Sequence, residues 1–137
     1  MTENARQRSA TMRAVKSHNT QPEMRVRRLL HRMGYRYRLH KASLAGKPDI
    51  VFPSRRCVIF VHGCFWHGHD CKRGHRIPKT NTEYWTRKIA RNIERFSDQV
   101  RELEAAGWRV LTVWECKLRD EDDLAITLRG FLEQASQ

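Results

Sequence analysis

The ten residues from His62 to Cys71 are dense in side chains that can do chemistry. They read His-Gly-Cys-Phe-Trp-His-Gly-His-Asp-Cys and include three histidines, two cysteines and two large aromatic residues. A packed core needs little of this chemistry, whereas metal binding and proton transfer depend on it. The segment directly follows the apolar run Cys57–Val61, which predicts a buried strand. A loop held at the end of a strand is a common way to present a rigid reactive site.

Four thiol and imidazole groups favour a tetrahedral zinc site. Cys64, His69 and Cys71 lie in the loop, and Cys116 follows a later apolar run. Three thiolates and one imidazole are a common ligand set for structural zinc. Cys116 can meet the loop if its strand lies beside the strand that precedes the loop. His75 competes as the fourth ligand, and the alternative is that Cys64 and Cys116 are small buried residues.

Asp49, His62 and His67 are the catalytic candidates. Asp49 opens a predicted strand after a Gly-Lys-Pro turn, and Mg²⁺ prefers oxygen ligands such as carboxylates. A metal held there would polarise a phosphate oxygen and activate water. One histidine can then act as the base while the other neutralises the phosphate, and the sequence leaves this division open. The competing interpretation makes Asp49 a turn residue and the histidines further metal ligands or surface groups.

A helix is predicted to begin after Thr20 and to end at Gly34. Thr20 offers a cap, Pro22 lies in the first turn, and apolar residues follow at helical spacing. Glu23, also in the first turn, has two interpretations. It either orients a histidine or a metal-bound water, or it forms half of a capping box with Thr20.

Three aromatic residues predict a wedge for duplex DNA. Phe65 and Trp66 lie at the tip of the loop, and Trp85 begins a helix beside a basic segment. An exposed Phe-Trp pair carries a solvation cost unless the rings find a partner. Inserted between base pairs, such rings would unstack the duplex, and a mismatched pair opposes this least. For Trp85 the core is a serious alternative, because it starts the apolar stripe of its helix.

The overall charge favours a polyanionic partner. The chain carries 27 Lys and Arg against 15 Asp and Glu, a net charge of +12, which favours nucleic acid before an anionic membrane. Residues 1–20 predict a basic arm, in which Arg13 and Lys16 would contact phosphates, and residues 21–137 predict one domain. No apolar run approaches the roughly 20 residues that span a bilayer, and no signal peptide is present, so we expect a cytoplasmic protein.

The order of the elements predicts an α/β domain with a small mixed sheet flanked by helices. The first three strands can pair as a meander, and a long helix capped by Thr82 can cross over to the last strand. The predicted strands are 35–40, 49–52, 57–61 and 108–115, and helices at 82–106 and from 120 onward follow the first helix.

Four segments together resemble the very short patch repair (Vsr) DNA mismatch endonucleases. They are Gly46–Asp49, Val58–His67, Thr82–Trp85 and Gly107–Cys116, and the likeness extends from about Thr11 to about Leu132. The resemblance implies a single domain of the restriction-endonuclease-like PD-(D/E)xK type with a structural zinc site. It implies Mg²⁺-dependent nicking of duplex DNA 5′ to the thymine of a T·G mismatch, which arises when 5-methylcytosine deaminates. It also implies a bacterial monomer with functional links to mismatch-repair proteins and a cytosine-5 DNA methyltransferase.

The resemblance also implies roles for individual residues. Asp49 and the main-chain carbonyl of Val61 would bind Mg²⁺, His67 would activate water, His62 would assist at the phosphate, and Glu23 would support the site. The implied zinc ligands are Cys64, His69, Cys71 and Cys116, and the residues implied to insert into DNA are Met12, Phe65, Trp66 and Trp85.

The chain departs from the family pattern at two places. Val61 stands where a well-known member has Thr, and a carbonyl contact survives this change whereas a side-chain role would not. Gly68 and Asp70 replace histidines of a denser run, so fewer histidines compete for zinc. The acidic-x-Lys half of the nuclease motif is missing, as it is throughout the resembling family, which uses histidine chemistry instead.

Two other functions compete with this expectation. A zinc-stabilised DNA-binding module without catalysis would need only the basic arm, the zinc loop and the aromatic residues. A restriction-type nuclease would cut both strands of fully paired DNA.

Overall fold

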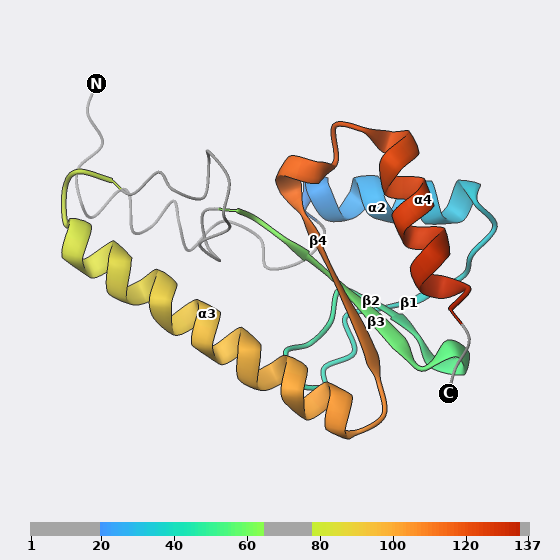
Figure 1. The fold of residues 1–137 in the computed structure, drawn as a ribbon, viewed down its shortest axis with the longest axis horizontal. Coiled ribbons are helices and arrows are strands. Elements are labelled where there is room, and N and C mark those ends of the chain that lie inside the picture. Colours follow the sequence, from blue (N-terminus) through green and yellow to red (C-terminus); the bar gives the residue numbers. More distant parts are fainter. Residues whose placement is uncertain (1–19, 65–77, 135–137) are drawn as a thin grey trace.

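The sheet of this protein is mixed and has four strands in the order β1-β2-β3-β4 (Figure 1). A computed structural model describes residues 20–64 and 78–134. β1 and β2 are antiparallel, as are β2 and β3, whereas β3 and β4 are parallel. The predicted meander and helical crossover are therefore confirmed. The strands are β1 Arg38–Leu39, β2 Ile50–Phe52, β3 Cys57–His62 and β4 Arg109–Trp114.

Helices cover both faces of this sheet within the described residues (Figure 1). α2 (Gln21–Arg32) and α4 (Glu121–Leu132) share one hydrophobic core with the sheet, and α3 (Thr82–Ala105) packs on the opposite face. β2 and most of β3 are therefore buried on both faces, which explains why they read as continuous apolar runs. Short 3-10 turns follow β2 and β4 at Pro53–Arg55 and Glu115–Lys117.

The predicted capping residues are found at the starts of α2 and α4 but not at the start of α3. Thr20 caps α2, because its Oγ1 accepts a hydrogen bond of 3.3 Å from the backbone N–H of Glu23. Asp120 caps α4 in the same way through the N–H of Asp123, at 3.0 Å. Thr82 was predicted to cap α3 but is its first helical residue, and its hydroxyl donates to the Pro78 carbonyl at 2.8 Å.

The predicted strand over residues 35–40 is shorter than expected. Only Arg38 and Leu39 pair with β2, since His40 has a φ of 45° that ends the extended backbone. Tyr35 and Tyr37 instead pack edge-on against Phe52, with ring centroids 6.4 and 6.2 Å away. Their burial, and not strand pairing, produced the alternating pattern.

The apolar stripe of α3 is narrower than the sequence suggested. Trp85, Ile89 and Leu103 are buried, whereas Ile93 is 46% exposed. Phe96 packs beside the core formed by the sheet and Leu103. None of the helices in the described ranges is both long enough and apolar enough to cross a membrane.

Candidate active site

Two neighbouring strands hold the carboxylate of Asp49. Asp49 directly precedes β2, and its Oδ2 accepts a 2.8 Å hydrogen bond from the backbone N–H of Val61 in β3. The antiparallel register that pairs Ile50 with Ile59 brings these two residues together. The carboxylate is therefore attached to the sheet through main-chain geometry.

The turn before Asp49 requires glycine. Gly46 has a φ of +74°, in the left-handed region, and a Cβ at this position would lie 2.9 Å from Oε1 of Gln99. Lys47 also has a positive φ, and its N–H donates to the Leu44 carbonyl at 3.0 Å. The Gly-Lys-Pro segment thus reverses the chain tightly against α3 and delivers Asp49 to the entrance of β2.

Glu23 brings a second carboxylate to the same place. It is 1% exposed, and its Oε2 lies 2.8 Å from Nε2 of His40 and 3.3 Å from Nη1 of Arg27. The Thr20 cap uses only the backbone N–H of Glu23, so the side chain is available to the site. Thr20 supplies its half of the predicted capping box, whereas the Glu23 carboxylate lies with His40 and Asp49, and its role at the site stays a prediction.

Glu23, His40 and Asp49 form a cluster able to bind a cation. One ligand atom from each residue lies within 4.8 Å of the others, on α2, after β1 and before β2 respectively. Two carboxylates at this separation repel each other, and a divalent cation removes that repulsion. Because Mg²⁺ takes oxygen ligands from one or two carboxylates and keeps several waters, the carboxylates of Glu23 and Asp49 fit this ion.

The environment of Asp49 opposes its negative charge in the metal-free protein. Burial raises the pKa of Asp49 to about 7, and the nearby charge of Glu23 adds to this effect. The hydrogen bond from the Val61 N–H and the charge of His40 act in the opposite direction. A carboxyl group perturbed in this way beside a second acidic group is typical of functional sites.

His40 is a member of the cluster that the sequence analysis missed. Its imidazole bridges toward Glu23, and its backbone N–H donates to the Asp49 carbonyl at 3.2 Å. The pairing of Leu39 with Ile50, continued by one residue, sets position 40 beside position 49. In the sequence His40 is the last residue of the predicted strand 35–40, and only the register of β1 with β2 links it to Asp49.

His62 lies at the end of β3 and faces α3. Its ring is 6% exposed and lies 4.3 Å from the ring of Phe96 and 5.4 Å from that of Trp114, measured between centroids. Neighbouring residues of a strand point to opposite faces, and Val61 packs with the core on the α2 side. The structure thus brings Glu23 and Asp49 together and packs the His62 ring among aromatic residues. Its role at a phosphate stays a prediction.

The two described zinc candidates follow neighbouring strands. Cys64 comes two residues after β3 and is fully buried, and Cys116 lies in the turn after β4. β3 and β4 are parallel neighbours in which His62 pairs with Trp114, so Cys64 and Cys116 each follow by two residues one member of this last pair. The expected adjacency of the two strands is confirmed, and the zinc ligand set stays a prediction.

Trp85 is 7% exposed, and its ring packs edge-on against Tyr84 with a centroid separation of 5.1 Å. This burial agrees with the core alternative for Trp85, and its insertion into DNA stays a prediction. The other predicted site residues lie outside the described ranges: Met12, Arg13, Lys16, Phe65, Trp66, His67, His69, Cys71 and His75.

Comparisons with known proteins identify a family of DNA endonucleases. A family model described as DNA mismatch endonuclease Vsr matches residues 2–73. The Type II nicking enzyme V.XorIIP of Xanthomonas oryzae pv. oryzae is 53% identical over 122 residues, which cover 89% of each chain. The DNA mismatch endonuclease Vsr of Escherichia coli K12 is 47% identical over 117 residues, covering 85% of this chain and 74% of the relative. The Type II nicking enzyme V.NmeAIP of Neisseria meningitidis is 46% identical over 114 residues, covering 83% and 81%.

Proposed function

This chain belongs to the family of Vsr DNA mismatch endonucleases, and from that premise we propose that it nicks duplex DNA 5′ to the thymine of a T·G mismatch by Mg²⁺-dependent hydrolysis. The family makes it a DNA endonuclease. The observation that carries the proposed chemistry is the convergence of the Glu23, His40 and Asp49 side chains within 4.8 Å.

In this proposal Asp49 and the main-chain carbonyl of Val61 bind the Mg²⁺ ion. The bound ion supplies a polarised phosphate oxygen and a more acidic water. Glu23 completes the negative site, and His40 and Arg27 hold its carboxylate in place through contacts of 2.8 and 3.3 Å. The hydrogen bond between the Val61 N–H and Asp49 supports the assignment, since it holds the main chain of Val61 beside the carboxylate.

The proton transfer is assigned to the histidines of the loop after β3. His67 takes a proton from the attacking water, and His62 assists at the phosphate. The position of His62 at the end of β3, directly after the residue that contacts Asp49, supports a site at this edge of the sheet. Since Val61-His62-Gly63 stands where the usual nuclease motif has an acidic residue and a lysine, imidazole groups fill this role.

A structural zinc ion bound by Cys64, His69, Cys71 and Cys116 would hold this loop. The parallel pairing of β3 with β4 supports the assignment, because it directs the segments that carry Cys64 and Cys116 to the same end of the sheet. The zinc ion adds a cross-link between two strand ends where the loop has little apolar sequence of its own.

Mismatch recognition is assigned to aromatic insertion and phosphate contacts. Phe65, Trp66 and Trp85, with Met12 from the N-terminal arm, would open the duplex where pairing is weakest. Arg13, Lys16 and the net charge of +12 would hold the backbone. One relative carries the name DNA mismatch endonuclease, which supports this specificity.

A nicking assay on matched pairs of duplexes tests the proposal. Each strand of a T·G duplex and of the corresponding T·A duplex is end-labelled and incubated with Mg²⁺ or with EDTA. We expect one nick, 5′ to the mismatched thymine, only with Mg²⁺. Cleavage of both strands of the T·A duplex would establish a restriction-type nuclease, and tight binding without any nick would establish a DNA-binding module.

A further inference from the structure

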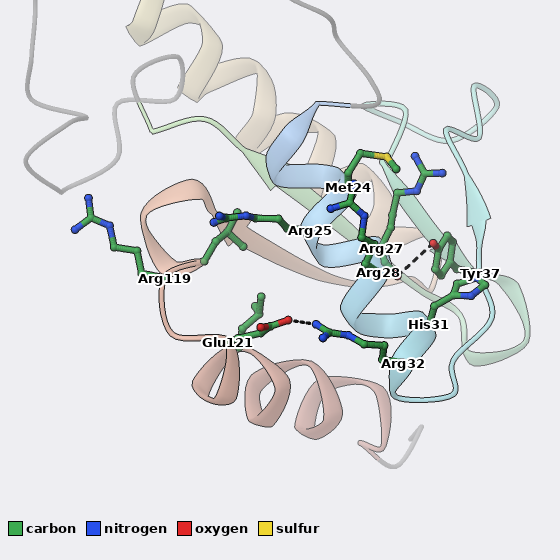
Figure 2. A pocket seen from close by; sticks show the side chains of 11 residues that line it. Met24, Arg25, Arg27, Arg28, His31, Arg32, Tyr37, Arg119 and Glu121 are labelled. Carbon is green, nitrogen blue, oxygen red and sulfur yellow. Dashed lines mark hydrogen bonds and ion pairs between the residues drawn. The ribbon is translucent and has the colours of Figure 1, made fainter.

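A positively charged pocket lies beside the acidic cluster on the α2 side of the sheet. It has a volume of about 930 Å³ and is formed by α2, by Tyr37 and by the segment from Leu118 to Leu124 (Figure 2). Its basic lining residues are Arg25, Arg27, Arg28, His31, Arg32 and Arg119. Glu121 is the single acidic residue among those that line it.

Only part of this positive charge is neutralised by the protein. Arg32 pairs with Glu121, as Figure 2 shows, and Arg27 pairs with Glu23. Arg25, Arg28 and Arg119 are exposed and make no hydrogen bond or ion pair with the described part of the chain. Figure 2 shows Arg25 and Arg119 directed outward on one side of α2, where an anionic ligand would offset the repulsion between like charges.

One residue, Arg27, belongs to the lining of the pocket and also contacts the acidic cluster. Arg27 lines the pocket, and its Nη1 lies 3.3 Å from Oε2 of Glu23. Glu23, Arg27 and His31 are spaced by four residues along α2 and therefore lie on one face of the helix. Tyr37 supports this face, because its hydroxyl donates to the Arg27 carbonyl at 3.4 Å and its ring packs against His31. A ligand that extends from the cluster along α2 enters the pocket.

We propose that this arginine-lined pocket binds phosphates of the substrate duplex about two to four nucleotides from the cleaved bond. The inference rests on the proposed function, since it takes the Glu23–Asp49 cluster as the place of cleavage. An α-helix rises about 1.5 Å per residue, so Glu23 and His31 are separated by about 12 Å along α2. Arg28 lies about 7.5 Å from Glu23 along the same helix. Phosphates of one DNA strand advance about 3.4 Å per nucleotide along the duplex axis, so a strand that runs along α2 would pass Arg28 and His31 about two to four nucleotides from Glu23.

The ligand chemistry favours a nucleic-acid backbone. Arginine forks bind phosphate oxygens in pairs, and several such forks along one face match a ligand with regularly repeated phosphates. An acidic peptide or an anionic lipid headgroup would also be attracted by the charge. Only the DNA backbone, however, is already brought to Glu23, at the end of the same helix face.

The first test measures how the affinity for a matched duplex depends on salt. Arg28→Ala with Arg119→Ala removes two unpaired guanidinium groups, and the slope of log K against log[salt] should fall by about 1 to 2. The control is the double variant Arg95→Ala with Arg101→Ala, which removes the same formal charge from exposed positions of α3 on the opposite face of the sheet. We expect the control to change the slope by less than half as much.

The second test locates the contact on the DNA. Neutral methylphosphonate groups are placed singly at each phosphate within six nucleotides of the thymine in a T·G duplex. Substitution two to four nucleotides from the cleaved bond should weaken binding of the wild-type protein by about 3- to 10-fold. The Arg28→Ala and Arg119→Ala double variant should lose this sensitivity and keep the sensitivity at other positions.

The outcomes separate this inference from the proposed function. The inference is overturned if the slope of log K against log[salt] falls equally in the pocket variant and in the control. It is also overturned if methylphosphonate substitution two to four nucleotides from the cleaved bond still weakens binding of the pocket variant. Both conclusions hold even when T·G nicking is normal. If the wild-type protein fails to nick but the pocket variant alone loses salt dependence, the proposed function fails and duplex binding in the pocket stands. Circular dichroism melts establish that both double variants are folded.

Discussion

The backbone N–H of Val61 donates a 2.8 Å hydrogen bond to Oδ2 of Asp49 and so ties the carboxylate that we propose to bind Mg²⁺ to β3, an inner strand of the sheet. This contact uses only the main chain of residue 61, so it does not depend on the side chain at the position where a well-known member of the family has Thr. The carbonyl that we propose as an Mg²⁺ ligand belongs to the same residue, Val61, as the N–H that positions Asp49. Sites held by strands in this way are more rigid than sites held by loops.

Asp49→Asn should make the metal-free protein more stable at pH 8 while abolishing nicking. Asn keeps an acceptor for the Val61 N–H but carries no charge in its buried position. Each pKa unit corresponds to about 1.4 kcal/mol, so the ionised Asp49 costs at most about 4 kcal/mol in the absence of metal. Thermal unfolding in EDTA measures the stability, and the nicking assay measures the activity.

The sign of this pH dependence follows from the raised pKa. Burial raises the pKa of Asp49 to about 7, so between about pH 4 and pH 7 the folded state binds more protons than the unfolded state. The contribution of Asp49 to stability is therefore full below about pH 4 and is lost as the pH rises to about 7. Glu23, His40 and Arg27 surround the group in both proteins, so the difference between wild type and Asp49→Asn isolates Asp49. Parallel stability curves from pH 4 to 8 would contradict the assignment.

His40→Ala should lower both the stability of the fold and the apparent affinity of the enzyme for Mg²⁺. The Glu23 carboxylate is 1% exposed and would lose a partner at 2.8 Å, which costs about 1–3 kcal/mol for a buried group. Loss of a residue that orients a metal ligand typically lowers affinity or activity about 10- to 100-fold. A Mg²⁺ titration of the nicking rate measures the second effect. His40→Gln retains a donor and should recover most of the activity, and equal losses in both variants would show that the effect does not come from the hydrogen bond to Glu23.

His67→Ala should slow the chemical step by about 100-fold or more if His67 is the general base. DNA affinity should remain close to that of the wild type, because no phosphate contact is assigned to this residue. Single-turnover nicking with saturating enzyme separates the chemical step from binding. His62→Ala serves as the comparison, and a larger loss of rate with a missing acidic limb of the pH–rate profile in that variant would exchange the two roles.

Cys116→Ser should release zinc and lower the melting temperature, because a structural zinc site contributes directly to folding. Zinc content is measured by atomic absorption on the full chain. The matched control is Cys57→Ala, which removes a thiol that is fully buried in the core and assigned no metal. It should lower stability while leaving zinc content unchanged. Retained zinc in Cys116→Ser would point to His75 as the ligand or to no zinc site.

Trp85→Ala should destabilise the fold, since the ring is 7% exposed. Removing a buried aromatic ring costs about 3–5 kcal/mol. Tyr84→Ala is the control, because Tyr84 is 51% exposed and should change stability little. Unfolding curves and T·G duplex affinities are measured together. A loss of affinity for Trp85→Ala without a loss of stability would identify the ring as a DNA contact and not as core.

The local elements of this fold were readable from the sequence because they depend on near neighbours. The Thr20 cap, the buried run Cys57–Val61 and the long helix after Asn81 all appear close to their predicted positions. The strand at 35–40 was overestimated because aromatic burial against Phe52 gives the same alternation as strand pairing. Periodicity reports which side chains are buried and not which backbone groups they pair with.

The sequence by itself determined the chemical inventory: a carboxylate after a glycine turn, a loop rich in histidine and cysteine, and an excess of positive charge. Only the tertiary structure decided that Glu23, His40 and Asp49 share one site, that the His62 ring packs toward α3, and that Arg27 links the cluster to the arginine-lined pocket. These relations depend on strand register and on which face of a strand or helix a side chain occupies. A shift of one residue along a strand reverses that face, and no residue type in the chain specifies it alone.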